Sequence, residues 1–296
     1  MALSMFEEVR ANNRASNMLV IIFFLIIGVL GAVIGLVYGD VTIGVFFAVV
    51  ITVVYIIVVY AAGDKIVLTL SGAKPVSKRE YPYLYHTIEG LAIAAGIKTP
   101  KAYVIDDSAL NAFATGINPD NAAITVTTGL LEKMNRQELE GVIAHEMSHI
   151  KGLDIKYMLF VTMLVGVITL LSDFLLRSFL WGGKGGRKKD MGKIQLVLIV
   201  LGITLAILSP LIIQLIKLAI SRKKEFTADA NAAILTRYPP GLASALKKIK
   251  NDPDPLVDTA NRATAHLYIS TPFRKVSNLF STHPPLDERI KRLEAM

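Results

Sequence analysis

Residues 135–151 read NRQELEGVIAHEMSHIK and carry the pattern on which the fold and the chemistry depend. Asn135 is suited to cap a helix, and Glu138 three positions later completes a capping box, so the spacing predicts a helix that starts there and runs through both histidines. Side chains four residues apart lie on one face of a helix. His145 and His149 can therefore reach a single metal ion, at about 2.0–2.1 Å from each imidazole nitrogen.

Glu146 follows the first histidine and faces an adjacent side of the same predicted helix. This HExxH pattern is typical of metallopeptidases, in which the glutamate takes a proton from a water at the metal and does not bind the metal itself. Ordinary residue frequencies produce the pattern by chance about once in a hundred chains of this length. A surface helix without a function is the alternative, and the apolar neighbours Val142, Ile143 and Ile150 argue against it.

Four long apolar blocks account for the composition of the chain. Of the 296 residues 53% are hydrophobic, and the mean hydropathy is +0.50, which is too apolar for an ordinary soluble domain. The uncharged blocks 18–38 and 41–62 are each long enough to span a bilayer and predict a transmembrane hairpin. The first block is longer than a signal-peptide core and no cleavage site follows it, which favours an uncleaved anchor. Blocks 157–181 and 194–220 predict a second hairpin, so we expect about four transmembrane or membrane-associated helices.

The depth of the second hairpin is left open by the sequence. Asp173 and Arg177 lie within its first block, which favours an interfacial position for that end. Arg10 and Arg14 favour a cytoplasmic N-terminus and a cytoplasmic soluble portion. Four complete spans would then place the basic loop 182–193 outside. Either the positive-inside rule fails here, or the second hairpin does not cross the membrane.

The net charge limits the classes of partner that we expect, and the absence of cysteine limits the residue types that can bind a metal. A net charge of +8 and a pI of about 9.5 would suit a nucleic-acid-binding protein. The basic residues flank the apolar blocks, however, where anionic lipid headgroups explain them. We therefore expect a lipid bilayer as a partner and no nucleic acid. Because the chain has no cysteine, a metal must be held by His, Asp or Glu.

The remaining sequence predicts an α+β, mainly helical domain that the second hairpin divides. Short strands are expected at 101–105 and 122–127, and helices at 83–95, 242–249 and 286–293; residues 65–70 alternate weakly, and 75–81 read as a polar loop. The strand at 122–127 directly precedes the HExxH helix. We expect it to be an edge strand, to which an extended substrate peptide could add by main-chain hydrogen bonds; a purely structural strand is the alternative.

We divide the chain into five parts on this basis: a tail at 1–17, a transmembrane hairpin at 18–62, the first part of the metallopeptidase domain at 63–156, a second membrane hairpin at 157–220, and the second part of the domain at 221–296.

A catalytic zinc site with two histidines requires a third protein ligand. Glu225 is the candidate, because it opens the sequence EFTAD on a second predicted helix. Asp229, one turn later, can accept the other ring N–H of a ligand histidine and fix its orientation. A solvated helix face after the basic residues 222–224 is the alternative. The hairpin 157–220 returns Glu225 to the membrane side of the HExxH helix, which would bring the two halves of the site together.

HEMSH, a membrane hairpin and then KKEFTADANAA at 223–233 resemble the HtpX family of membrane-bound zinc metallopeptidases. NAFATG at 111–116 and STHPP at 281–285 extend the resemblance over nearly the whole chain. The chain is more distantly similar to the CAAX prenyl proteases, but it has too few spans for their large intramembrane chamber.

The resemblance implies a zincin-like domain with a gluzincin-type site. One Zn²⁺ would be held by His145, His149 and Glu225, with Glu146 as the base and Asp229 bonded to a ligand histidine. The resemblance also implies a multi-pass protein of the inner (plasma) membrane with its active site facing the cytoplasm. Its role there would be quality control, by degradation of misfolded or damaged membrane proteins.

Two further residues have roles that the sequence leaves open. His283 precedes two prolines and is similar to a histidine that stabilises the tetrahedral intermediate in related proteases; a role in capping the final helix is the alternative. Asn111 is expected in a loop between strands. The resemblance suggests that its amide holds the substrate backbone, and a structural loop is the alternative.

We therefore expect a membrane-bound zinc endopeptidase that hydrolyses internal bonds of polypeptides. A non-enzymatic scaffold with a structural zinc would need a fourth protein ligand and would leave Glu146 without a function. A divalent-metal transporter would place its ligands within the spans, at mid-membrane depth. Here the predicted ligands lie in polar sequence outside the apolar blocks.

Overall fold

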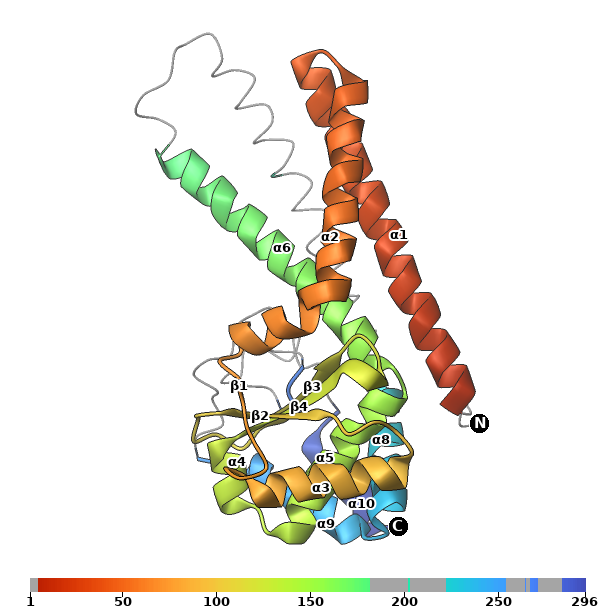
Figure 1. Ribbon diagram of the computed structural model, residues 1–296, viewed down its shortest axis with the longest axis vertical. Helices are drawn as coiled ribbons and strands as arrows, with labels where there is room; N and C mark the ends of the chain where they lie inside the picture. Colours follow the sequence, from red (N-terminus) through yellow and green to blue (C-terminus); the bar gives the residue numbers. More distant parts are fainter. Residues whose placement is uncertain (1–4, 182–201, 203–221, 254–263, 265–266, 271–283) are drawn as a thin grey trace.

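The computed structural model describes residues 5–181, 202, 222–253, 264, 267–270 and 284–296 (Figure 1). Helices α1 (Met5–Tyr38) and α2 (Val41–Leu70) run side by side away from a body that holds the sheet and the shorter helices. A third long helix, α6 (Asp154–Trp181), leaves the same side of that body. The architecture is thus mainly helical α+β, as predicted.

The hairpin of α1 and α2 forms as the apolar blocks predict. Asp40 caps α2, because its side chain accepts hydrogen bonds from two backbone N–H groups of the first turn. The two helices approach so closely at Gly31 and Gly44 that a Cβ added to Gly44 would lie 2.1 Å from the Gly31 carbonyl oxygen. Small residues permit this contact, as is common between membrane helices.

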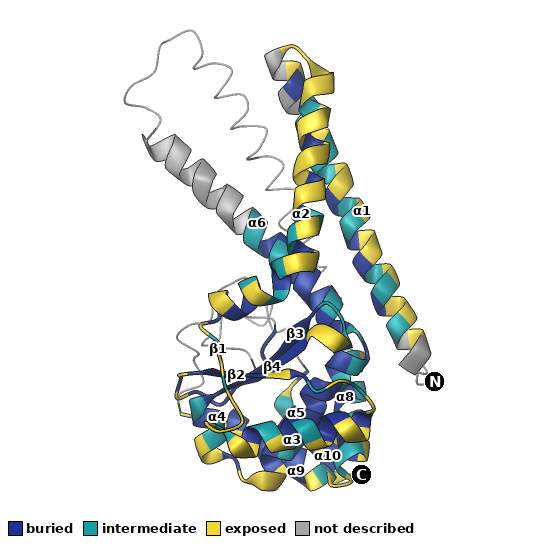
Figure 2. Cartoon of the chain, viewed as in Figure 1, coloured by how far each residue is buried: buried dark blue, intermediate teal, exposed yellow. Residues whose placement is uncertain are grey.

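Within the part of the chain that the structure describes, two helices are long and apolar enough to cross a membrane, over Val9–Val29 and Val41–Leu70. Many of their residues are exposed above the body (Figure 2). Both helices exceed the predicted blocks: the segment predicted as a tail is helical from Met5, and residues 65–70, which alternate weakly, form the end of α2. The block 157–181 lies in α6, whereas the basic loop 182–193 and the block 194–220, apart from residue 202, lie outside the described residues.

The sheet has four strands in the order β1 (Lys74–Pro75), β2 (Lys101–Ile105), β4 (Ala122–Thr127), β3 (Ala112–Gly116). β2 and β4 are parallel, and the outer pairs are antiparallel. The prediction that 122–127 forms an edge strand is wrong, because β3 pairs with β4 along its whole length. The sequence predicts no strand at 112–116, and the alanines and glycine of this segment have low strand propensity. β3 therefore lies at the edge of the sheet.

Side chains of the strands alternate between two apolar cores. One core contains Ile124 and Val126 together with the buried faces of α3 (Pro82–Ala95), α5 (Arg136–Lys151), α9 (Pro239–Lys250) and α10 (Leu286–Glu294). The other contains Phe113 and Ala123 together with the bases of α2 and α6. Because both faces of β4 are covered, all six of its residues are buried. The helices α3, α5, α9 and α10 and the strands β2 and β4 confirm the elements that the sequence predicts.

The helix that carries HExxH lies at the centre of the body, between α3, α8 (Arg222–Thr236) and α9. Its capping box forms as predicted: Asn135 Oδ1 accepts from the Glu138 N–H at 3.0 Å, and Glu138 Oε2 accepts from the Asn135 N–H at 2.8 Å. His145 and Glu146 are 1% and 3% exposed. A surface helix without a function is therefore excluded. The short helices η1 (Pro119–Asn121) and α4 (Thr128–Lys133) complete the body.

Candidate metal centre

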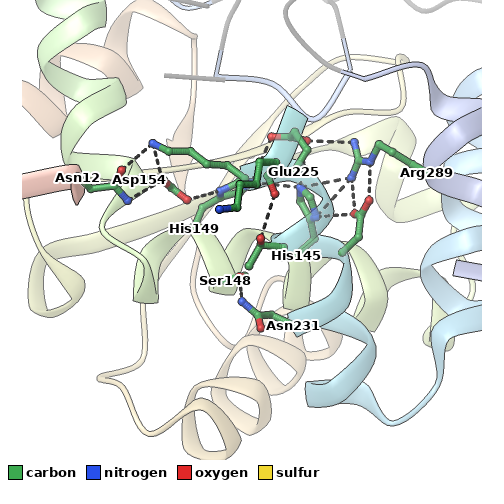
Figure 3. Close-up of polar contacts among 12 residues, drawn as sticks. Asn12, His145, Ser148, His149, Asp154, Glu225, Asn231 and Arg289 are labelled. Atoms are coloured by element: carbon green, nitrogen blue, oxygen red, sulfur yellow. Dashed lines mark hydrogen bonds and ion pairs between the residues drawn. The ribbon is translucent and has the colours of Figure 1, made fainter. Parts of the chain in front are cut away.

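His145, His149 and Glu225 meet where α5 contacts α8 (Figure 3). The two histidine Nε2 atoms are 3.2 Å apart. Glu225 Oε2 lies 3.7 Å from His145 Nε2, and Glu225 Oε1 lies 3.6 Å from His149 Nε2. Ser148 Oγ accepts a hydrogen bond from Asn231 Nδ2 at 2.9 Å and joins the same two helices. All three members of the cluster are buried.

The spacing of this cluster fits a metal ion. Two ligand atoms about 2.0–2.1 Å from a tetrahedral zinc lie roughly 3.4 Å apart. The separations of 3.2, 3.6 and 3.7 Å fall around that value. Imidazole nitrogens and a carboxylate oxygen are also suitable ligands in their chemistry. The residues present can thus hold a metal between α5 and α8.

A buried carboxylate and a buried guanidinium support the first histidine. Asp229 Oδ1 lies 3.0 Å from His145 Nδ1, which turns the Nε2 atom toward the cluster. Arg289 Nε donates to Asp229 Oδ2 at 2.9 Å, and Arg289 Nη2 donates to Asp229 Oδ1 at 2.7 Å. Burial would raise the pKa of Asp229, but the charge of Arg289 and the contact with His145 lower it strongly. Asp229 is therefore an ionised acceptor.

Arg289 is not predicted from the sequence, although it is fully buried. Its Nη1 lies 3.3 Å from Glu225 Oε2, so one guanidinium faces both acidic residues of α8. The available signal was its place on the apolar face of α10, one residue before Ile290 and one turn before Leu293. A charged residue at such a position requires buried partners of opposite charge.

The second histidine has its own carboxylate, Asp154, which the sequence analysis also did not identify. Asp154 Oδ2 lies 3.0 Å from His149 Nδ1. Burial would lower the pKa of His149, but this bond and the nearby carboxylates raise it to about 9. Burial would raise the pKa of Asp154, but His149 and Lys224 lower it to about 2. The carboxylate is thus ionised and directs the Nε2 atom of His149 to the cluster.

Glu146 faces the same pocket as the three clustered residues. Burial raises the pKa of its carboxyl group, against the opposing effect of the two histidines. A carboxylate whose pKa is shifted toward neutrality is suited to accept and return a proton. The pocket is lined by Ala114, His145, Glu146, His149, Met158, Glu225, Leu267 and Ile269.

Asn111 directly precedes β3 and is not among the residues that line this pocket. Its Nδ2 donates to the Ser270 carbonyl at 3.0 Å, and its Oδ1 accepts from the Ser270 N–H at 3.3 Å. Ile269 N–H also donates to the Ala112 carbonyl at 2.9 Å. The Asn111 amide thus holds the backbone of this chain, and contact with a substrate would require exchange of these bonds. His283 lies outside the described residues.

Comparisons with known proteins agree with this geometry. Residues 78–296 match the model of Peptidase family M48. The chain is 44% identical over 294 residues to the protease HtpX homolog of Caldanaerobacter subterraneus subsp. tengcongensis, which covers 99% of this chain and 98% of the relative. It is 45% identical over 295 residues to the HtpX homolog of Dictyoglomus turgidum, with 98% and 94% covered. This chain belongs to the HtpX family of M48 peptidases.

Membership in the HtpX family confirms the resemblance that the motifs indicate. Family membership, together with the two apolar helices and the cluster of possible metal ligands, identifies this chain as a membrane metalloprotease. The fold is shared with the crystal structure of S. mikatae Ste24p, at a TM-score of 0.52 and 22% identity, over 98% of this chain and 67% of that chain.

Proposed function

We propose that this chain is a zinc endopeptidase that hydrolyses internal peptide bonds of membrane proteins. The observation that carries the proposal is the buried cluster of His145, His149 and Glu225, with separations of 3.2–3.7 Å, and Glu146 in the same pocket. Two histidines and one glutamate form a ligand set of catalytic zinc sites, which keep a fourth position for water or substrate.

Zinc, when bound, supplies a Lewis acid that polarises the scissile carbonyl and lowers the pKa of a water to about 7. The Glu146 carboxylate accepts the proton of the attacking water and then gives it to the leaving amine. Asp229 and Asp154 each accept a hydrogen bond from the Nδ1 side of a histidine, so both rings are held with Nε2 toward the cluster. Arg289 balances the charge of Asp229 and Glu225.

The finer parts of the proposal concern the membrane and the biological role. We infer four membrane helices, with the body on the cytoplasmic side, from the apolar blocks and from the basic Arg10 and Arg14 on α1. Quality control of misfolded or damaged membrane proteins follows from the HtpX family alone. We further propose that His283 stabilises the tetrahedral intermediate and that Asn111 contacts the substrate.

The geometry argues against the two non-peptidase functions. A structural zinc needs a fourth protein ligand, whereas the metal-binding group found among the described residues has three members. A transporter needs ligands at mid-membrane depth, whereas the ligand cluster lies within the body, at the base of the apolar helices.

The decisive experiment compares casein cleavage by the detergent-purified wild type and by Glu146→Gln, with the zinc content of both measured by elemental analysis. We expect equal zinc and a loss of turnover by at least a hundredfold in the variant, because general-base catalysis contributes roughly 10²–10⁴-fold. Cleavage by Glu146→Gln at the wild-type rate would refute the mechanism. Equal zinc with no cleavage by either protein would favour the scaffold function.

A further inference from the structure

Asn12 connects the first long helix to the surroundings of the metal centre (Figure 3). Its Nδ2 donates to the Gly152 carbonyl at 2.7 Å and to Asp154 Oδ1 at 2.8 Å. Its Oδ1 accepts from Lys224 Nζ at 2.6 Å. Asn12 is 3% exposed, so water does not compete for these bonds. A single amide of α1 thus joins the end of α5, the start of α6 and the start of α8.

These contacts lead directly to two of the metal-binding residues. Asp154 shares its carboxylate between two sides: Oδ2 faces His149 Nδ1 at 3.0 Å, and Oδ1 faces Asn12 and Lys224 at 2.8 and 3.0 Å. Lys224 is the residue before Glu225. A shift of Asn12 would therefore move the carboxylate that orients His149 and also the backbone beside Glu225.

The turn between α5 and α6 requires such support. Leu153 has a φ of 59°, in the left-handed region, which costs roughly 1–2 kcal/mol for a residue other than glycine. Asn12 bonds both neighbours of this residue, Gly152 and Asp154. Strained backbone persists where the surrounding structure holds it. The amide of α1 therefore stabilises the turn that brings Asp154 back to His149.

We propose that Asn12 is a positioning residue of the metal centre, and that the first membrane helix sets the placement of His149 and Glu225 through it. This inference rests on the proposed function for the identity of the metal. It makes α1 a part of the site's support as well as a membrane anchor. Loss of the Asn12 amide should weaken metal binding even though Asn12 does not touch the metal.

The chain offers a matched control in Asn13. This residue is next to Asn12 on α1 and also bonds α6, because its Oδ1 accepts from Lys156 Nζ at 3.0 Å. That bond goes to a lysine on α6 that is not a partner of His149 in the described contacts. Asn12→Ala and Asn13→Ala thus remove the same chemical group from the same helix, and only the first removes a contact with Asp154.

The experiment measures Zn²⁺ affinity of the full-length variants in detergent by chelator competition, and the absorption spectrum of bound Co²⁺. We expect Asn12→Ala to bind Zn²⁺ at least tenfold more weakly and to change the Co²⁺ spectrum, since loss of groups that orient metal ligands typically costs 10–100-fold. Asn13→Ala should match the wild type in both. Asn12→Asp, which keeps the size of the side chain but places a carboxylate against Asp154, should also weaken binding.

A double-mutant comparison separates positioning from general stability. If Asn12 acts through Asp154, Asn12→Ala should add little to the loss of affinity caused by Asp154→Asn. Wild-type affinity and spectrum in Asn12→Ala, or losses that add fully in the double variant, would overturn the inference. The readouts need no substrate. Altered metal binding without casein cleavage by any variant would refute the proposed function and leave this inference standing.

Discussion

The acidic residues Asp229 and Glu225 share one buried cation, Arg289. Asp229 and Glu225 are 2% and 1% exposed, and Arg289, which is 0% exposed, contacts both. Ionised groups taken out of water lose several kcal/mol of solvation each, and their pairing must offset that loss. At the scale of single residues, we therefore expect Arg289 to stabilise the site although it is not a ligand.

Replacing Arg289 with methionine should lower the free energy of unfolding by about 3–5 kcal/mol, because it leaves buried charges without a partner. Arg292→Met, on the exposed side of the same helix, removes a surface ion pair with Glu288 at 2.8 Å and a contact of the guanidinium with the Phe226 ring at 3.6 Å. It should cost at most about 1–2 kcal/mol. Thermal unfolding of both variants in detergent with zinc measures the difference. Similar midpoints for the two variants would contradict this account.

The lowered pKa of Glu138 should make the free energy of unfolding depend on pH. Burial would raise the pKa of its carboxyl group, but hydrogen bonds from Lys248, Ser244 and the Asn135 N–H lower it below the usual 4.5. A lowered pKa means that the ionised group stabilises the fold above the usual value, and that this contribution is lost as pH falls through the folded value. Glu138→Gln should thus be about 1–3 kcal/mol less stable at neutral pH.

The difference between wild type and Glu138→Gln should shrink below about pH 4.5, as both side chains become neutral. Glu140→Gln is the control, because its partner Arg136 lies 3.0 Å away on an exposed surface. Denaturant unfolding at several pH values checks the prediction. A deficit of Glu138→Gln that is constant down to acidic pH would show that charge is not the cause.

Helical spacing links most of the residues that the sequence predicts for the site, whereas His283 and Asn111 are predicted from the family resemblance. His145, Glu146 and His149 lie on one predicted helix, and Glu225 and Asp229 lie on another, so a periodicity of 3.6 residues indicates both groups. The family resemblance implies the full ligand set. Arg289 and Asp154 were missed because their partners come from other elements, and a sequence alone does not show that α10 lies against α8 or that a left-handed residue turns Asp154 back.

At the scale of elements, the position of α5 depends on close backbone contact with α9. A Cβ added to Gly141 would lie 2.7 Å from the backbone nitrogen of Leu242. Gly141→Ala must therefore push α9 away from the metal-binding helix and should cost about 1–3 kcal/mol. Gly90→Ala, on the exposed face of α3 with no atom near its added Cβ, should be neutral or stabilising by up to about 1 kcal/mol. Thermal unfolding should show a lower midpoint for Gly141→Ala and an unchanged or higher midpoint for Gly90→Ala.

The outer strand β3 is the element that sequence patterns do not predict. The helices α3, α5, α9 and α10 and the strands β2 and β4 have strong periodicity or β-branched residues, and the sequence predicts them within a few residues. The edge of the sheet was assigned to the wrong strand, because NAFATG carries little strand propensity. Only the pairing of Ala112 to Gly116 with β4 shows that β3 is an outer strand of the sheet among the described residues.

For the whole molecule, the ligand cluster joins two distant parts of the chain. His145 and His149 belong to the part of the chain before α6, and Glu225 belongs to the part after the apolar blocks 157–181 and 194–220. An ion bound by all three would connect α5 to α8 in the folded protein and would have no comparable site in the unfolded chain. Metal binding should therefore stabilise the whole body as well as permit catalysis.

Removal of zinc should accordingly lower the melting temperature of the wild type. At a free zinc concentration a hundredfold above its dissociation constant, the stabilisation is about 2.7 kcal/mol. Glu146→Gln should show the same shift, because Glu146 is not expected to hold the metal. Glu225→Ala, without its third ligand, should show little shift and little bound zinc. Thermal unfolding with zinc and with a chelator, alongside elemental analysis, makes the test. A full shift in Glu225→Ala would place the stabilising metal elsewhere and would remove Glu225 from the ligand set.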